Sequence, residues 1–499
     1  MVKPALLIAT LVFLLGGVGF RSYATSRGVP LLAADAVVFL PPALSFHERG
    51  ELVNRIWTGS DVLDQSGTGR MVYHGFLYPM FLSFLIWGSD YLAVTRGLAI
   101  LHGVATLLVG VLLWNFARVW NWKLTAPRIF LILLLTIACA NYTQGALGRA
   151  EPMAAVVLML ALCGASRTNS AWHALILGAV IGLVTAIDPI IGLFAGLAAA
   201  ASFAWRYRAV RASREIGVAA ACSLCVFVLC FSWYPYSFAD WVTGSWRLGK
   251  SAFVEPAAAF GWQDFPKTWF FSGSRWMLGA TLPLTIWCGL HILRQRRDKE
   301  KEPAAPLLFY VLLSLGGVAL VTSTLYAPWA SYNLLPLMPL AFLAVFYELG
   351  RERESPRSKF RAVAAAILIA ASLGFVGDLY ERAHILSAGM SLPEARKRLA
   401  DFRAQHPQSL IALDKHLFTF TEDLSNIVWT KPARLPMRGD FWINAQGFTR
   451  DQTPPSFIGF RVVKNYYNPR RLSLFGIPLW RMDRGCGFAI YARADSALP

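Results

Sequence analysis

Two carboxylates border apolar runs, where each could act as a base, bind a cation or pair with a basic side chain. Asp35 lies within the apolar run 33–39, and Glu151 follows Arg149 at the start of another apolar run. An unpaired carboxylate at a membrane face is costly, so both positions are candidates for chemistry. The alternatives are a helix N-cap or surface acid for Asp35 and an ion pair with Arg149 for Glu151, at a helix start where negative charge suits the dipole.

Basic side chains near these acids could hold a phosphate. Arg70 and His74 flank Tyr73 just before the apolar run 74–88, and Arg149 precedes Glu151 by two positions. Guanidinium groups bind phosphate oxygens through paired hydrogen bonds, so Arg70 and Arg149 suit such a site. The alternative is anchoring at the membrane interface, which Arg and Tyr favour.

Two further features have both a structural and a functional interpretation. Asp188 precedes Pro189, which is typical of a helix start with an Asp cap and proline in the first turn. The segment 237–275 is rich in Trp and Phe, whose rings stack on sugars but also form interfacial belts.

The composition indicates a polytopic membrane protein. Of 499 residues, 56% are hydrophobic and 15% charged, whereas average soluble domains have about 25% charged residues. The net charge of +18 does not indicate a nucleic-acid partner, because Lys and Arg concentrate in short loops, as is typical of cytoplasmic loops. These basic loops are residues 118–128, 206–214, 294–301 and 351–361.

The sequence predicts about eleven spans, since a spanning helix needs about 20 mostly apolar residues. They are expected at 4–20, 91–117, 124–141, 152–165, 172–187, 189–205, 216–236, 276–293, 306–325, 330–347 and 360–377. We interpret the run 74–88 as a juxtamembrane or re-entrant helix on the outer side, because counting it as a span would put a later basic loop outside. The N-terminus is then inside, and everything after about residue 378 is outside.

The expected fold is therefore an α-helical membrane domain followed by a small soluble domain. The transmembrane domain covers 1–377, with outer loops 21–90 and 237–275, and an extracytoplasmic α+β domain covers 378–499. Within that domain we expect a helix at 393–405 and strands at 410–413, 427–429, 457–463 and 488–491.

Several function classes lack their motifs, and one family resemblance remains. No Walker motif, dinucleotide loop, zinc spacing or serine nucleophile elbow is present. Four pieces occur in order: Asp35, the re-entry His74-Gly75-Phe76-Leu77-Tyr78-Pro79, the turn Gly148-Arg149-Ala150-Glu151-Pro152 and the late run 331–339. Together they resemble the C-type (GT-C) superfamily of membrane glycosyltransferases, which includes lipid A aminoarabinose transferases and protein O-mannosyltransferases. The chain departs from the family pattern at Ala36, Asp188 and Ser331.

The resemblance implies transfer of a sugar from a polyprenyl-phosphate-linked donor to a lipid, polysaccharide or protein hydroxyl at the outer membrane face. It implies catalytic roles for Asp35, as the base, and Glu151. Arg70, His74 and Arg149 are the expected ligands of the donor phosphate. The residues expected to line the substrate site are Tyr73, Tyr78, Asp188 and Tyr332. We expect no obligatory metal, with Mg²⁺ or Mn²⁺ shared by the two carboxylates as the alternative.

Two other functions fit a membrane protein with an outer domain. One is a transporter or flippase of a lipid-linked saccharide, which should carry charges at mid-membrane depth and often has internal repeats. The other is a non-catalytic scaffold that presents residues 378–499. The scaffold gives no reason for Asp35 and Glu151 to converge.

Overall fold

A computed structural model defines the arrangement of most of the chain. It describes residues 3–29, 36–56, 68–72, 75–144, 148–165, 171–207, 209–249, 284–290, 310–315, 338–350, 358–423, 425–430, 438–444, 459–466, 470–474, 477–482 and 487–494. Asp35, Tyr73, His74 and Tyr332 lie outside the described residues.

Helices dominate the described chain. They are α1 (Pro4–Ser26), α2 (Ala36–Arg49), α3 (Leu77–Ser83), α4 (Tyr91–Val119), α5 (Ala126–Thr143), α6 (Glu151–Ala165), α7 (Ala171–Ile187), α8 (Pro189–Arg206), α9 (Ala209–Phe231), α10 (Phe238–Gly249), α15 (Met338–Gly350), α16 (Ser358–Ser387), α17 (Leu392–Gln405) and the 3-10 helix η5 (Lys415–Phe420).

The apolar helices are compatible with the expected membrane character. Within the described ranges, five helical segments are long and apolar enough to cross a membrane: α1, α4, α5, α9 and the segment that begins in α16. The helices α6, α7, α8 and α15 are apolar but shorter. The predicted number of spans stays a prediction, because those expected at 276–293, 306–325 and 330–347 lie partly outside the described residues.

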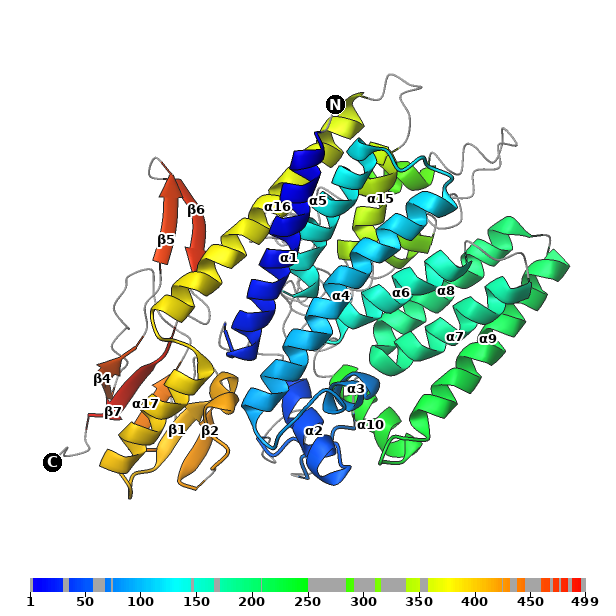
Figure 1. The fold of residues 1–499 in the computed structure, drawn as a ribbon. Coiled ribbons are helices and arrows are strands. Elements are labelled where there is room, and N and C mark those ends of the chain that lie inside the picture. The colour runs from blue at the N-terminus through cyan, green and yellow to red at the C-terminus, as the bar shows by residue number, and fades with distance from the viewer. Residues whose placement is uncertain are drawn as a thin grey trace.

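The short helices and the C-terminal sheet gather at one end of these helices. The run 74–88 contains the helix α3, whose seven residues span about 10 Å, far less than a hydrocarbon core of about 30 Å. Figure 1 shows α2, α3 and α10 together at the end of the bundle away from the N-terminus. The C-terminal sheet lies at the same end (Figure 1).

The C-terminal sheet is mixed. Its strands, in the order β2-β1-β3-β7-β4, are β1 (Ile411–Asp414), β2 (Ile427–Thr430), β3 (Phe441–Asn444), β4 (Phe460–Asn465) and β7 (Ala489–Arg493), and β5 (Arg470–Leu474) pairs separately with β6 (Ile477–Met482). The strand β1 is parallel to β2 and β3, whereas β7 is antiparallel to β3 and β4. The helix α17 covers one face through Leu399 and Phe402.

The long helix α16 joins the two parts of the chain. It continues to Ser387, so the boundary expected at 377 and 378 falls inside a helix. Asp378 and Arg382 lie within this helix, and the Arg382 side chain is buried with 1% exposure.

Close packing of α7 on α9 depends on small residues. A Cβ atom on Gly178 would collide with the backbone of Ala219, and one on Gly182 would collide with the backbone of Ser223. Each helix therefore presents two small residues four positions apart. In apolar surroundings such residues let helix backbones approach closely, which increases van der Waals contact.

We expect Gly182→Ala to lower the thermal unfolding temperature of the purified protein in detergent, because the added methyl group must push α7 away from α9. Gly217→Ala in α9 is the matched control, since a Cβ there would meet nothing within 4 Å. In a helix that change should be neutral or stabilise by about 0.5–1 kcal/mol. Equal unfolding temperatures for the two variants would contradict the close contact.

Candidate functional site

The turn before α6 packs against the start of α2. Gly148 has a φ of +73°, and a Cβ built on it would lie 2.8 Å from the Cβ of Ala36. Both the backbone conformation and the contact therefore require glycine. Ala36 directly follows Asp35 in the sequence. The chain beside Asp35 thus meets the turn that carries Arg149 and Glu151.

Arg149 and Glu151 form a local ion pair. The Arg149 Nε donates to both carboxylate oxygens of Glu151 at 3.1 Å, and its Nη2 donates to Oε1. The two side chains are only 13% and 12% exposed. Glu151 is the first residue of α6, where its negative charge complements the helix dipole. The pair holds a carboxylate and a guanidinium together at the mouth of the helices.

Asp188 caps α8, and the charge of Glu151 contributes to its raised pKa. Its Oδ1 accepts hydrogen bonds from the backbone nitrogens of Ile190 and Ile191 at 3.0 and 3.1 Å. This is the capping role that its position before Pro189 indicated. Burial, reinforced by the negative charge of Glu151, raises the pKa of Asp188 to about 7. The turn between α7 and α8 therefore lies within electrostatic reach of Glu151.

The re-entry segment packs on that same turn. A Cβ on Gly75 would collide with the carbonyl oxygen of Ile187 and would lie 2.8 Å from the backbone nitrogen of Asp188. On the other side, a Cβ on Gly244 of α10 would collide with the carbonyl oxygen of Val72. The chain on both sides of Tyr73 and His74 is thereby held between the α7–α8 turn and α10.

Arg70 contacts an aromatic ring rather than the ion pair of Arg149 and Glu151. Its guanidinium carbon sits 5.4 Å from the centre of the Tyr236 ring, and the residue is exposed. The Tyr234 hydroxyl donates to the Met71 carbonyl at 2.6 Å, and this bond connects the segment 68–72 to the segment after α9. An exposed guanidinium on an aromatic face remains available to an anion.

Tyr78 points into the helices. The residue is fully buried, and its hydroxyl lies 3.4 Å from the Nε2 of His102 on α4. Its ring meets the Phe39 ring edge-to-face, with centroids 5.5 Å apart. Burial, with a smaller contribution from Glu151, raises the pKa of Tyr78. Tyr78 therefore connects the neighbourhood of Glu151 to polar groups deeper between α4 and α5.

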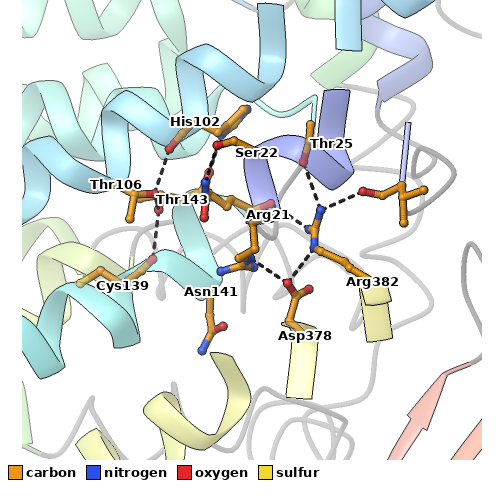
Figure 2. Close-up of polar contacts among 12 residues, drawn as sticks. Arg21, Ser22, Thr25, His102, Thr106, Cys139, Asn141, Thr143, Asp378 and Arg382 are labelled. Carbon is orange, nitrogen blue, oxygen red and sulfur yellow. Dashed lines mark hydrogen bonds and ion pairs between the residues drawn. The ribbon is translucent and has the colours of Figure 1, made fainter. Parts of the chain in front are cut away.

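Those polar groups form a buried network. The Nδ1 of His102 is hydrogen-bonded to the carbonyl oxygen of Thr143, and the hydroxyls of Thr106 and Thr143 are 2.6 Å apart. The next residue, Gln144, donates from Nε2 to the Ser22 hydroxyl of α1 at 3.3 Å. Figure 2 shows Ser22, His102, Thr106 and Thr143 close together.

At the far side of this network, one aspartate holds two buried arginines. Oδ2 of Asp378 lies 2.7 Å from the Nε of Arg21 and 2.7 Å from the Nε of Arg382 (Figure 2). Both arginine side chains are 1% exposed and that of Asp378 is 19% exposed. Arg21 also lies over the Phe375 ring, 5.0 Å from its centre.

Arg382 binds oxygen atoms at the ends of α1 and α5. Its Nη1 donates to the Thr25 hydroxyl at 3.1 Å and to the Val29 carbonyl at 2.8 Å. Its Nη2 donates to the Gln144 carbonyl at 3.4 Å. These bonds hold Val29, and the contact with Gly148 holds Ala36.

The sequence patterns do not indicate roles for Arg21, His102, Asp378 and Arg382. Hydropathy ends the first span at residue 20, but α1 continues to Ser26 and buries Arg21. The available signal was a charge that interrupts an otherwise spanning segment, which is rare unless the charge is paired. Pairing with residues more than 350 positions away has no local signature.

Of the expected site residues, Arg149 and Glu151 form an ion pair, and Asp188 and Tyr78 lie within electrostatic reach of Glu151. Arg70 lies at the edge, and Asp35, Tyr73, His74 and Tyr332 lie outside the described residues. Convergence of Asp35 with Glu151 stays a prediction, supported by the contact of its neighbour Ala36 with Gly148. No protein-family model, curated protein or solved structure matches this chain.

We expect Asp378→Asn to destabilise the protein by about 3–5 kcal/mol, because it leaves two buried guanidinium groups without a counter-charge. Asp423→Asn is the matched control: Asp423 pairs with Arg403 at 2.8 Å, but its side chain is 63% exposed. Exposed pairs contribute about 0–1 kcal/mol. Thermal unfolding of both variants in detergent measures the difference, and a similar small loss in both would show that the buried cluster does not support the fold.

Proposed function

We propose that this chain is a multi-pass membrane glycosyltransferase. It transfers a sugar from a polyprenyl-phosphate-linked donor to an acceptor hydroxyl at the outer face of the membrane, and its C-terminal domain is extracytoplasmic. The acceptor is a lipid, a polysaccharide or a protein. No nucleic acid is involved.

One observation carries the proposal. The ion pair of Arg149 and Glu151, the capping carboxylate of Asp188 and the chain beside Asp35 meet at one end of the apolar helices. The short helices α2, α3 and α10 gather at that end (Figure 1). Acids and a guanidinium at the mouth of an apolar bundle suit a substrate with a lipid tail and a charged phosphate.

The reaction needs few groups. The acceptor oxygen attacks the anomeric carbon, the bond from that carbon to the phosphate oxygen breaks, and the phosphate leaves with the electron pair. The acceptor proton passes to the Asp35 carboxylate as general base. Arg149, with Arg70 and His74, stabilises the negative charge on the departing phosphate. Glu151 orients Arg149.

A metal is not needed by this scheme. Glu151 uses both of its oxygens to accept from Arg149, so a Mg²⁺ or Mn²⁺ ion on this carboxylate would compete with the guanidinium. The positive charge that such an ion would supply is provided by arginine. We therefore propose a reaction without an obligatory metal.

The alternative functions fit these contacts less well. Arg21 lies five residues before the end of α1, about 8 Å at 1.5 Å per residue, so the buried charges are near one membrane face. A transporter should instead carry them near the midplane. A scaffold would give no reason for the chain beside Asp35 to pack against the turn that carries Glu151.

We expect residues 213 and 409 to lie on opposite sides of the membrane, because α9 begins at the inner face and the C-terminal domain lies outside in this proposal. The test uses Ser213→Cys and Ser409→Cys in a chain whose seven native cysteines are replaced. An impermeant maleimide should label position 409 in intact cells and position 213 only after permeabilisation. Labelling of both positions from the same side would refute the topology.

We expect Asp35→Asn to reduce sugar transfer about 10²–10⁴-fold, because it keeps the shape of the side chain and removes the base. Transfer is measured with purified protein and a panel of polyprenyl-phosphate sugars. Glu151→Gln should also lower turnover, since it weakens the hold on Arg149. Near wild-type transfer by Asp35→Asn on the true substrate pair would show that the catalytic assignment is wrong.

Glu215→Gln is the matched control for Glu151→Gln. Glu215 is also a buried glutamate beside an arginine near a helix start, 4.0 Å from Arg211 on α9. It lies in the first turns of α9, at the inner end in the proposed topology. Equal losses of turnover in the two variants would indicate a general effect of removing a buried charge rather than a role at the site.

A further inference from the structure

A cavity of about 110 Å³ lies where the C-terminal domain meets the outer helices. Ser45 and Glu48 of α2 form one wall, Tyr91 at the start of α4 forms another, and Phe418 and Trp429 of the C-terminal domain close the third side. One buried water needs about 10–15 Å³ measured in this way. The cavity therefore has room for several waters or for part of a larger polar molecule.

A buried hydroxyl in this cavity lacks a partner. Ser45 is 4% exposed, and its Oγ has no hydrogen-bond partner among the residues that the structure describes. Buried polar groups are nearly always satisfied, so an unsatisfied one that lines a cavity indicates a bound water or ligand. Ser45 can both donate to and accept from a ligand hydroxyl.

The charges around the cavity are already paired. Glu48 lies 3.5 Å from Arg55, and Glu422 is bound by Arg396 and also accepts from the Tyr91 backbone nitrogen at 3.1 Å. Two glutamates and two arginines cancel formally. An ionic ligand would meet no excess of opposite charge, whereas a neutral ligand with many hydroxyls could donate to the carboxylates and accept from Arg55.

Aromatic rings supply the apolar part of the wall. The rings of Tyr91 and Phe418 meet edge-to-face with centroids 5.1 Å apart, and Trp429 is half-buried. The C–H face of a sugar ring is apolar, so it gains dispersion and burial against such rings. Carboxylates, a free hydroxyl and aromatic faces around one small space match a neutral sugar, which has both polar edges and apolar faces.

We propose that this cavity binds a sugar unit of a neutral oligosaccharide acceptor, an assignment that rests on the proposed transferase function. The helix α2 connects the two places, since Ala36 meets the turn of Glu151 and Ser45 lines the cavity nine positions later. At 1.5 Å per residue this is about 14 Å. The sugar in the cavity is thus remote from the hydroxyl that receives the transferred unit, and the acceptor has several units.

The test measures binding without turnover. Saturation-transfer NMR is run on the full-length protein, in a detergent without a sugar headgroup, with methyl β-glucopyranoside, methyl α-mannopyranoside and methyl β-galactopyranoside as probes. At least one glycoside should bind. Ser45→Ala should weaken its binding about 2–10-fold through the lost hydrogen bond, and Trp429→Leu should weaken it at least as much through the lost ring face.

Ser391→Ala is the matched control. Ser391 is 3% exposed and its hydroxyl also lacks a partner among the described residues, but it stands at the N-terminal end of α17 and does not line the cavity. The Ser391→Ala variant should bind the glycoside with the affinity of the unaltered protein. Thermal unfolding temperatures show whether each variant is folded. If Trp429→Leu does not fold, the glycoside affinity of Ser45→Ala, the smaller change, tests the assignment of the cavity.

Absence of binding for all three glycosides, or equal affinity in Ser45→Ala and Ser391→Ala, would overturn the assignment of the cavity. The proposed function has a separate outcome. Glycoside binding that Ser45→Ala weakens, in a protein that transfers no sugar from any polyprenyl phosphate, would leave the cavity as a sugar site and refute the transferase. Sugar transfer by a protein that binds no glycoside at this cavity would leave the transferase function in place and refute the cavity as a sugar site.

Discussion

The contact of Asp378 with two buried arginines links the first helix to a helix that lies more than 350 residues later in the sequence. Arg21 comes from the first helix and Arg382 from the helix that leads to the C-terminal domain. Buried charges cost several kcal/mol each unless they are paired and hydrogen-bonded, so neither helix can shift without exposing an uncompensated guanidinium. The same Arg382 binds the carbonyl oxygens of Val29 and Gln144, and thereby sets the ends of α1 and α5.

Glycine contacts then determine what meets at the candidate site. Gly148 admits the start of α2, and Gly75 admits the turn between α7 and α8. No larger residue could stand at either place, because its Cβ would collide with neighbouring atoms. The first contact places the turn of Arg149 and Glu151 against the chain that follows Asp35, and the second places the backbone of Asp188 against the segment that follows His74. The charged groups are thus positioned by backbone packing rather than by long, flexible side chains.

The C-terminal domain is docked on the same end of the bundle. Arg396 of α17 bridges Asp90, the cap of α4, and Glu422 after η5, and the Leu392 backbone nitrogen donates to the Arg27 carbonyl at 2.8 Å. These contacts fix the wall of the cavity that holds Ser45. The helix α2 therefore touches the turn that carries Glu151 at one end and the C-terminal domain further along.

The sequence by itself determined the features that depend on local patterns. Hydropathy predicted the long apolar helices, Asp188 before Pro189 predicted a capped helix, and the spacing in 393–405 predicted α17. The tertiary structure alone decided the pairing of Arg21 with Asp378, the buried strand β3, the contact of Gly148 with Ala36 and the unsatisfied hydroxyl of Ser45. The physical reason is the sequence separation between the residues that interact. Hydrophobic periodicity and capping involve neighbours within a few residues, whereas burial, ion pairing and cavities depend on which distant segments the fold brings into contact.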